Sequence, residues 1–411
     1  MKRFFMLVGG ALLAAPIAAW ALQAQQAPFD NDGVITKAEW QRVMALGAKG
    51  GVIDLGQQRV EFQRGKLQPT KPLILRGGVF SAISLDQWRN VTFEGTIFRP
   101  AATDNRDYWM VVAYDPQNLT FDRVNMSGAT LGDGKLVYQS LSVRNGSNVA
   151  VLNSRFWGMA NFMGFMRTNG VRLENNHFTN IREGVQLVAV NNAVVRGNAF
   201  GPYFPYQGDH SDGVQLFTAG LTASDVAARN VTIEGNLFVA NPSRRAQGVF
   251  IRDEGGLFKS GRGYADITIR NNLMVGTGWA GIGVIDPVQR LLIDNNHLLI
   301  RTDKSDRVTN NWIEVRAVQP SGSARVTNNK SGPMLLAAGV QHANNQVVPP
   351  VTEAEGKRII DQWYAARQRA APPARQAASP TTSSSGSESA TASSPVSQTV
   401  RVRRGNSVFS D

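Results

Sequence analysis

The heptapeptide Asn230–Asn236, NVTIEGN, alternates apolar and polar residues and then ends in an Asn-bearing turn. Such alternation predicts a β-strand with one buried face, because successive side chains of a strand point to opposite sides. Gly and Asn at its end favour a tight bend, since both tolerate left-handed backbone geometry. The stretch therefore predicts a short strand that is closed at once by a turn.

The same pattern recurs along most of the chain, and the shortest spacings between copies are about 22 to 24 residues. The nine copies are NVTFEG (90–95), NLTFDR (118–123), NVAVLNS (148–154), GVRLENN (170–176), NAVVRGN (192–198), NVTIEGN (230–236), DITIRNN (266–272), RLLIDNN (290–296) and ARVTNN (324–329). A fixed period of this length predicts a solenoid in which each turn, or lap, contributes one supersecondary unit. The Asn residues at the bends are expected to stack into amide ladders that serve the fold.

A second strand follows several of these turns. It reads EGVQLV (183–188), DGVQLF (212–217), QGVFIR (247–252), AGIGVI (280–285) and NWIEVR (311–316). Stacked laps would place equivalent residues about 4.8 Å apart in parallel sheets, with Val, Leu and Ile pointing inward.

These repeats resemble those of the right-handed parallel β-helix family, which includes pectate lyases, polygalacturonases and alginate epimerases, over roughly residues 50 to 348. The resemblance implies an all-β fold, a right-handed parallel β-helix over residues 51–348. Both open ends of such a solenoid need caps. Residues 25–50 hold one candidate, opened by the capping box Thr36-Lys-Ala-Glu39, and residues 349–370 hold a second capping helix. The Ala-, Pro-, Ser- and Thr-rich stretch 371–411 is predicted to be a disordered tail.

The composition of the chain predicts where the protein is located and what kind of partner it binds. Residues 1–24 have a basic start, an apolar run and small residues at their end, which is typical of a secretory signal peptide. We therefore expect a periplasmic or secreted protein with no transmembrane segment, acting as a monomer. The chain has no cysteine, which excludes disulfides and thiol chemistry. Its net charge of +12 favours an anionic partner, and for an exported protein an acidic polysaccharide is favoured over nucleic acid.

Lap spacing points to the face where a ligand binds, because insertions in a solenoid become loops that commonly line the binding face. The spacing grows to 38 residues between Asn198 and Asn236 and to 36 between Asn236 and Asn272. Aligning the second strands on their glycine makes Glu183 and Asp212 neighbours. The substrate-binding residues predicted from this alignment and its loops are Glu183, Gln186, Gln215, Tyr203 and Trp279. Carboxylates, amides and aromatic rings are the groups that a sugar site needs.

The reaction that we expect is β-elimination from a uronate polymer, which requires neutralisation of the substrate carboxylate, a base, and an acid for the leaving oxygen. The predicted catalytic residues are His210, Asp212, Arg245, Arg252 and Tyr206. Arg252 or Arg245 would hold the carboxylate, His210 or Arg245 would be the base and Tyr206 the acid. No cofactor is required by this scheme; calcium held by Glu183, Asp209 and Asp212 is the alternative means of neutralisation.

Three other functions stay open on the same scaffold. A glycoside hydrolase would use paired carboxyl groups. The motif HSDG (210–213) is similar to the Asn-Thr-Asp-Gly motif of polygalacturonases and maps their acid onto Asp212, although the next lap, QGVFIRDEGG, lacks their Asp-Asp and Gly-His-Gly motifs. The stretch YQGDH (206–210) is similar to the Tyr and Asp-Pro-His of alginate epimerases, without the proline. A non-catalytic glycan-binding or adhesion solenoid is the remaining alternative.

Overall fold

The computed structural model describes residues 29–30, 33–100, 109–128, 138–205, 211–241, 246–302, 311–319 and 322–370. The predicted signal peptide and tail lie outside these residues, as do Tyr206, Asp209, His210 and Arg245. The chain divides into two compact units, Met1–Glu353 and Ala354–Asp411. Among the described helices, none is both long and apolar enough to cross a membrane.

The nine predicted repeat strands all belong to one parallel sheet, which has 12 strands in the described part of the chain. Its strands are β2 Gly51–Asp54, β5 Leu73–Arg76, β8 Arg89–Glu94, β11 Gln117–Asp122, β14 Ser147–Leu152, β16 Asn169–Glu174, β18 Asn191–Arg196, β21 Arg229–Glu234, β24 Ala265–Arg270, β27 Gln289–Asp294, β30 Ala324–Thr327 and β33 Gln341–Ala343. The repeat pattern is thus confirmed as a stack of one strand per lap.

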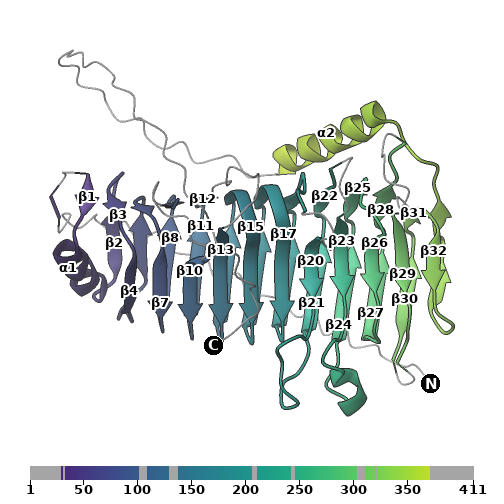
Figure 1. Ribbon diagram of the computed structural model, residues 1–411, viewed down its shortest axis with the longest axis horizontal. Coiled ribbons are helices and arrows are strands. Elements are labelled where there is room, and N and C mark those ends of the chain that lie inside the picture. The colour runs from purple at the N-terminus through teal and green to yellow at the C-terminus, as the bar shows by residue number, and fades with distance from the viewer. Residues whose placement is uncertain are drawn as a thin grey trace, which may run out of the picture. The chain divides into compact units, whose positions relative to one another are not determined.

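The remaining described strands form a 22-stranded parallel sheet that bends around the other sides of each lap. They are β1 Val34–Ile35, β3 Arg59–Val60, β4 Gln63–Lys66, β6 Val79–Phe80, β7 Ile83–Asp86, β9 Ile97–Phe98, β10 Trp109–Tyr114, β12 Asn125–Ser127, β13 Gln139–Arg144, β15 Arg155–Met166, β17 His177–Val188, β19 Ala199–Phe200, β20 Asp212–Leu216, β22 Leu237–Val239, β23 Gln247–Ile251, β25 Leu273–Val275, β26 Ala280–Val284, β28 His297–Leu299, β29 Trp312–Val315, β31 Lys330–Ser331, β32 Met334–Leu336 and β34 Gln346–Val347. The first unit is a right-handed parallel β-helix, whose laps lie side by side in sequence order (Figure 1).

The predicted second strands are confirmed as the C-terminal half of β17 and as β20, β23, β26 and β29. One register differs from the alignment: Ala280 pairs with Trp312 rather than with Asn311, because the ladder is irregular between Ala280 and Ile282. The Asn311 amide instead donates to the Leu299 carbonyl at 2.8 Å, which holds it at the bend before the strand.

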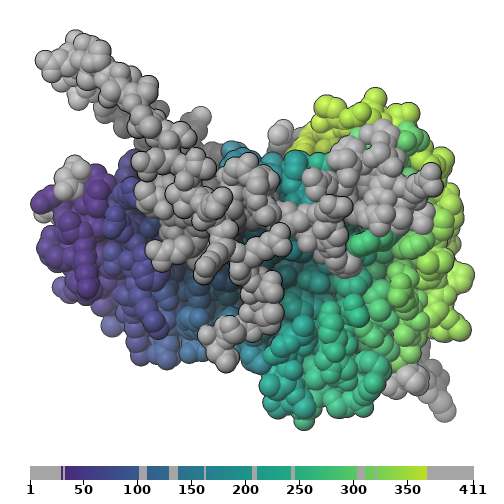
Figure 2. All heavy atoms as spheres, in the orientation of Figure 1, coloured from purple at the N-terminus to yellow at the C-terminus, as the bar shows by residue number. Residues whose placement is uncertain are grey.

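Equivalent apolar residues stack inside the helix. The rings of Phe156, Phe178, Phe200 and Phe238 follow one another with centroid separations of 4.9, 4.6 and 5.0 Å and are almost parallel. The spacing matches the distance between neighbouring strands, so each ring covers the next and water is excluded along the axis. In the space-filling view, the colours of the β-helix follow one another in sequence order (Figure 2).

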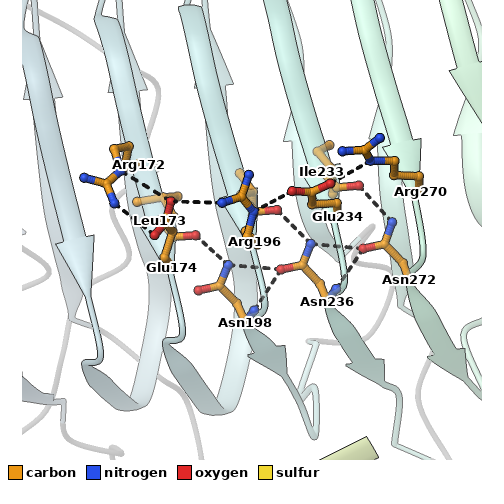
Figure 3. A network of polar contacts seen from close by, with 11 residues as sticks. Arg172, Leu173, Glu174, Arg196, Asn198, Ile233, Glu234, Asn236, Arg270 and Asn272 are labelled. Atoms are coloured by element: carbon orange, nitrogen blue, oxygen red, sulfur yellow. Dashed lines mark hydrogen bonds and ion pairs between the residues drawn. The ribbon is translucent and has the colours of Figure 1, made fainter. Parts of the chain in front are cut away.

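A buried asparagine ladder lines one corner of each lap. The side chains of Asn176, Asn198, Asn236, Asn272, Asn296, Asn329 and Asn345 form it. Each amide donates to the next ladder oxygen at 2.9 to 3.0 Å, and each ladder oxygen also accepts from a backbone N–H. Figure 3 shows three rungs and their bonds to strand carbonyls. The prediction that these asparagines serve the fold is therefore confirmed.

Helix α1, Lys37–Gly47, begins with the predicted capping box, in which Thr36 and Glu39 satisfy each other's backbone N–H groups. Hydrogen bonds from Thr36 and Asp30 lower the pKa of Glu39 to about 2. Helix α2 spans Glu353–Ala370 and, apart from its first residue, belongs to the second unit. The helix was predicted, and its capping role stays a prediction. A short 3₁₀ helix, η1 Leu257–Ser260, lies in the loop before β24.

Candidate functional site

The structure brings Glu183 and Asp212 together on neighbouring laps, as the repeat predicts. They belong to a row of residues in register on successive laps, which we call the acid row. Its members are Trp109, Gln139, Asn161, Glu183, Asp212, Gln247, Ala280 and Trp312. The backbone N–H of Asp212 donates to Oε2 of Glu183 at 3.4 Å, so the Glu183 carboxylate lies against the backbone of the next lap at the centre of the row.

The acid pair is buried rather than part of an open surface, which corrects the expectation from the repeat. Glu183 is 8% exposed and Asp212 is 1% exposed. The residue after each of them is a glycine, and at this point, which we call the corner, the missing side chains let neighbouring laps pack closely. A Cβ atom on Gly213 would lie 2.5 Å from the ring of Phe238, and one on Gly184 would overlap the carbonyl of Gly213. The laps therefore pack more closely at this corner than side chains would allow.

Tyr203 was expected to offer its ring to a sugar, but the ring is fully buried in the core, where its backbone pairs with Ile181. The part of Tyr203 that lies near the acid pair is its hydroxyl group. This group is so close to the backbone of Gly213 that a Cβ atom added there would lie only 2.5 Å from it. Burial first, and then the negative charges of Asp212 and Glu183, raise the pKa of Tyr203 well above its ordinary value. The phenol therefore stays protonated beside the acid pair.

Several polar atoms around the acid pair are buried and lack a hydrogen-bond partner in the described part of the chain. They are Asn161 Oδ1, the Tyr203 hydroxyl, Ser211 Oγ and Gln247 Oε1. An unsatisfied buried polar atom costs about 1 to 3 kcal/mol, so a cluster of four is unfavourable for the fold alone. A polar ligand that bonded to these atoms would remove that cost.

Three further predicted residues lie beside the acid row. Gln186 and Gln215 are in register in an outer row, two residues further along each strand from the corner glycine, and both are partly exposed. Trp279 directly precedes β26, has a left-handed backbone with φ of 50° and is partly exposed. The outer row continues through Phe250, Gly283 and Glu314, as the alignment predicts.

Arginines form ion pairs on both sides of the β-helix, among them Arg316 with Glu314 on the acid-row side. On the outside of the 12-stranded sheet, Arg172, Arg196 and Arg270 lie in a chain of ion pairs with Glu174 and Glu234 (Figure 3). On the acid-row side, neither Arg252 nor Arg144 has an ion-pair partner among the described residues, and Arg252 is exposed. Arg144 stands before the acid pair and Arg252 after it in lap order.

The inserted segments follow the C-terminal ends of β20 and β23, whereas the acid row lies at the N-terminal ends of these two strands. After β20 and after β23 the chain leaves in loops that lie side by side (Figure 1). The Arg262 guanidinium of the second loop donates to the Ala223 carbonyl of the first, and Asp225 of the first loop pairs with Arg167. A hollow of about 330 Å³ lies between them, lined in part by Leu221, Thr222, Gly256 and Lys259. The widened spacing therefore produces loops, as predicted.

Calcium fits the described residues only in part. Glu183 and Asp212 supply oxygen ligands of the kind that calcium prefers, and the third predicted ligand, Asp209, lies outside the described residues. Within the described ranges, no group of three or more His, Asp or Glu side chains could hold a metal ion.

No protein-family model matches the chain, and no curated protein gives a significant match. Several solved structures follow a similar course. The surface protein and adhesin PfbA of Streptococcus pneumoniae is 13% identical, with 81% of this chain and 97% of that chain covered and a TM-score of 0.43. The A-module of the Azotobacter vinelandii mannuronan C-5 epimerase AlgE6 is 15% identical, with 80% and 99% covered and a TM-score of 0.48. The polygalacturonase of Erwinia carotovora ssp. carotovora is 10% identical, with 82% and 99% covered and a TM-score of 0.37. By the parallel, lap-wise pairing of its own strands, the chain is a right-handed parallel β-helix protein.

Proposed function

We propose that this protein is exported, binds an acidic polysaccharide along the acid row and cleaves it as a lyase by β-elimination. The observation that carries the proposal is the pair of arginines, Arg144 and Arg252, which have no ion-pair partner among the described residues. They lie on laps before and after the acid pair, each five residues further along its strand than the member of the acid row on that lap. A guanidinium without a protein partner is suited to a bidentate contact with a uronate carboxylate. The net charge of +12 would also attract such a polymer.

In the proposed reaction Arg252 pairs with the carboxylate of the uronate and so makes the C5 proton more acidic. His210 or Arg245 takes that proton, the C4–O bond breaks as the C4–C5 double bond forms, and Tyr206 gives a proton to the leaving oxygen. Glu183, Gln186 and Gln215 hold the sugar hydroxyls. The neutral phenol of Tyr203 lies beside the acid pair in the core.

The assay follows the ultraviolet absorbance of the unsaturated product when the mature protein is incubated with pectate, alginate and neutral polysaccharides. Absorbance should rise with a uronate polymer only. Arg252→Gln should lower kcat/KM by about 10²-fold, since it removes a cation from the developing charge. The matched control is Arg325→Gln, an exposed arginine of the 12-stranded sheet that also has no ion pair with described residues, and it should change nothing. Absence of unsaturated product from every polymer would refute the lyase.

A glycoside hydrolase is the second candidate, because Asp212 and Glu183 form a carboxyl pair on adjacent laps. It predicts new reducing ends without absorbance, and their loss in both Asp212→Asn and Glu183→Gln. An epimerase would change the sugar composition without cleavage, and an adhesion protein would bind without any product. Repeating each assay with a chelator tests the calcium alternative, which predicts lost activity that added calcium restores.

A further inference from the structure

Trp109 opens the acid row, and its indole reaches across to the strand β15. A Cβ atom placed on Gly164 would lie 3.3 Å from Cη2 and 3.9 Å from Cζ2 of that indole. Gly164 is not among the glycines with a left-handed backbone, so its conformation does not require glycine. The missing side chain instead gives the ring room to lie close to the strand, and the partly exposed Trp109 forms a platform beside it.

A cation stands next to this platform. Ser142 pairs with Gly164, and Arg144 follows two residues after Ser142, on the same face of the sheet. The guanidinium carbon of Arg144 lies 5.9 Å from the centroid of the Tyr114 ring, whose residue is 38% exposed. This contact orients the guanidinium without neutralising it.

We propose that Trp109, Gly164 and Arg144 form a subsite for one uronate residue, on the N-terminal side of the acid pair. The indole takes the apolar face of the sugar ring, and Arg144 takes its carboxylate. The lap of Gly164 directly precedes that of Glu183, and Arg144 and Trp109 lie two and three laps before that of Glu183. The inference rests on the proposed function, and it makes the ligand a chain that runs across the laps.

The test compares Trp109→Ala, Trp109→Phe and Arg144→Gln with the unaltered protein. Binding of uronate oligomers of increasing length is measured by calorimetry, and kcat and KM are measured with the same oligomers. Trp109→Ala and Arg144→Gln should weaken binding of the longer oligomers and raise KM for them about tenfold. Trp109→Phe should lose less, because a smaller ring remains. Arg144→Gln should leave binding of neutral oligomers unchanged.

Matched controls are Trp157→Ala, a tryptophan that is 48% exposed on the N-terminal half of β15, and Arg325→Gln. If Trp109→Ala and Trp109→Phe behave like Trp157→Ala while the unaltered protein binds and cleaves the oligomers, the subsite is refuted and the proposed function stands. If Arg144→Gln weakens neutral and acidic oligomers equally, the carboxylate contact is wrong. If the unaltered protein binds no uronate chain, the subsite and the proposed function are both wrong.

Discussion

At the scale of single residues, the candidate site depends on the lack of a side chain at Gly213. A Cβ there would lie 2.5 Å from Phe238 and from the Tyr203 hydroxyl, so only glycine lets Asp212 approach Glu183 over a closely packed corner. The glycine in DGVQLF was visible in the sequence and served to align the strands. Its physical reason was not visible, because the contact joins side chains from different laps.

Gly213→Ala is expected to destabilise the protein by about 1 to 3 kcal/mol, because the added methyl group overpacks the corner. Urea unfolding measures the change. Gly65→Ala is the matched control, since its nearest neighbour would be the flexible end of Met44 at 3.5 Å. It should stay within about 0.5 kcal/mol of the unaltered protein. Equal changes in the free energy of unfolding for the two variants would show that the packing at Gly213 can accommodate a methyl group.

The ionisation of Tyr203 should make the stability of the folded protein depend on pH in the alkaline range. Its pKa is raised in the folded state by burial and by Asp212 and Glu183, so its contribution to stability is complete below the unfolded value of about 10. That contribution is lost as the pH rises through the folded pKa. Stability should therefore fall in alkali, and less steeply in Tyr203→Phe. Thermal unfolding across alkaline pH checks this, and identical slopes for both proteins would contradict it.

At the scale of elements, the buried ladder and the exposed ion pairs run along the same strands but differ in burial (Figure 3). The Asn236 side chain accepts from the N–H and the amide of Asn198 and donates to Asn272 and to the Val195 carbonyl. Arg270 makes a 2.6 Å contact with Glu234 at the surface. The inner row should therefore determine the spacing of the laps, and the outer row should contribute little.

Asn236→Ala should cost about 3 kcal/mol or more, because it leaves several buried groups of Asn198 and Val195 without partners. Arg270→Gln should cost no more than about 1 kcal/mol, since exposed ion pairs contribute little. Denaturant unfolding at low and high salt measures both. The reverse order of the two losses would contradict the assignment of stability to the ladder.

At the scale of the whole molecule, periodicity in the sequence predicted the β-helix and the register that joins Glu183 to Asp212. It did not predict strands such as β19 or β22, because two or three residues are too few for alternation to be recognised. It also missed Trp109 and Asn161, since their laps carry Met110 and Phe162 where the alignment relied on glycine. The burial of Asp212 could not be predicted, because it arises from packing between laps.

The central claim is that the stacking of successive laps makes Glu183 and Asp212 side-by-side neighbours, and the absence of cysteine from the chain allows a clean test. Neighbouring strands bring equivalent Cα atoms to about 4.8 Å, within the range of about 4.4 to 6.8 Å that a disulfide needs, whereas two laps separate them by about 10 Å. The measurement is mass spectrometry of the oxidised Glu183→Cys/Asp212→Cys protein, with Glu183→Cys/Gln247→Cys as control. We predict an intramolecular disulfide in the first protein alone. No link in the first, or equal links in both, would contradict the account.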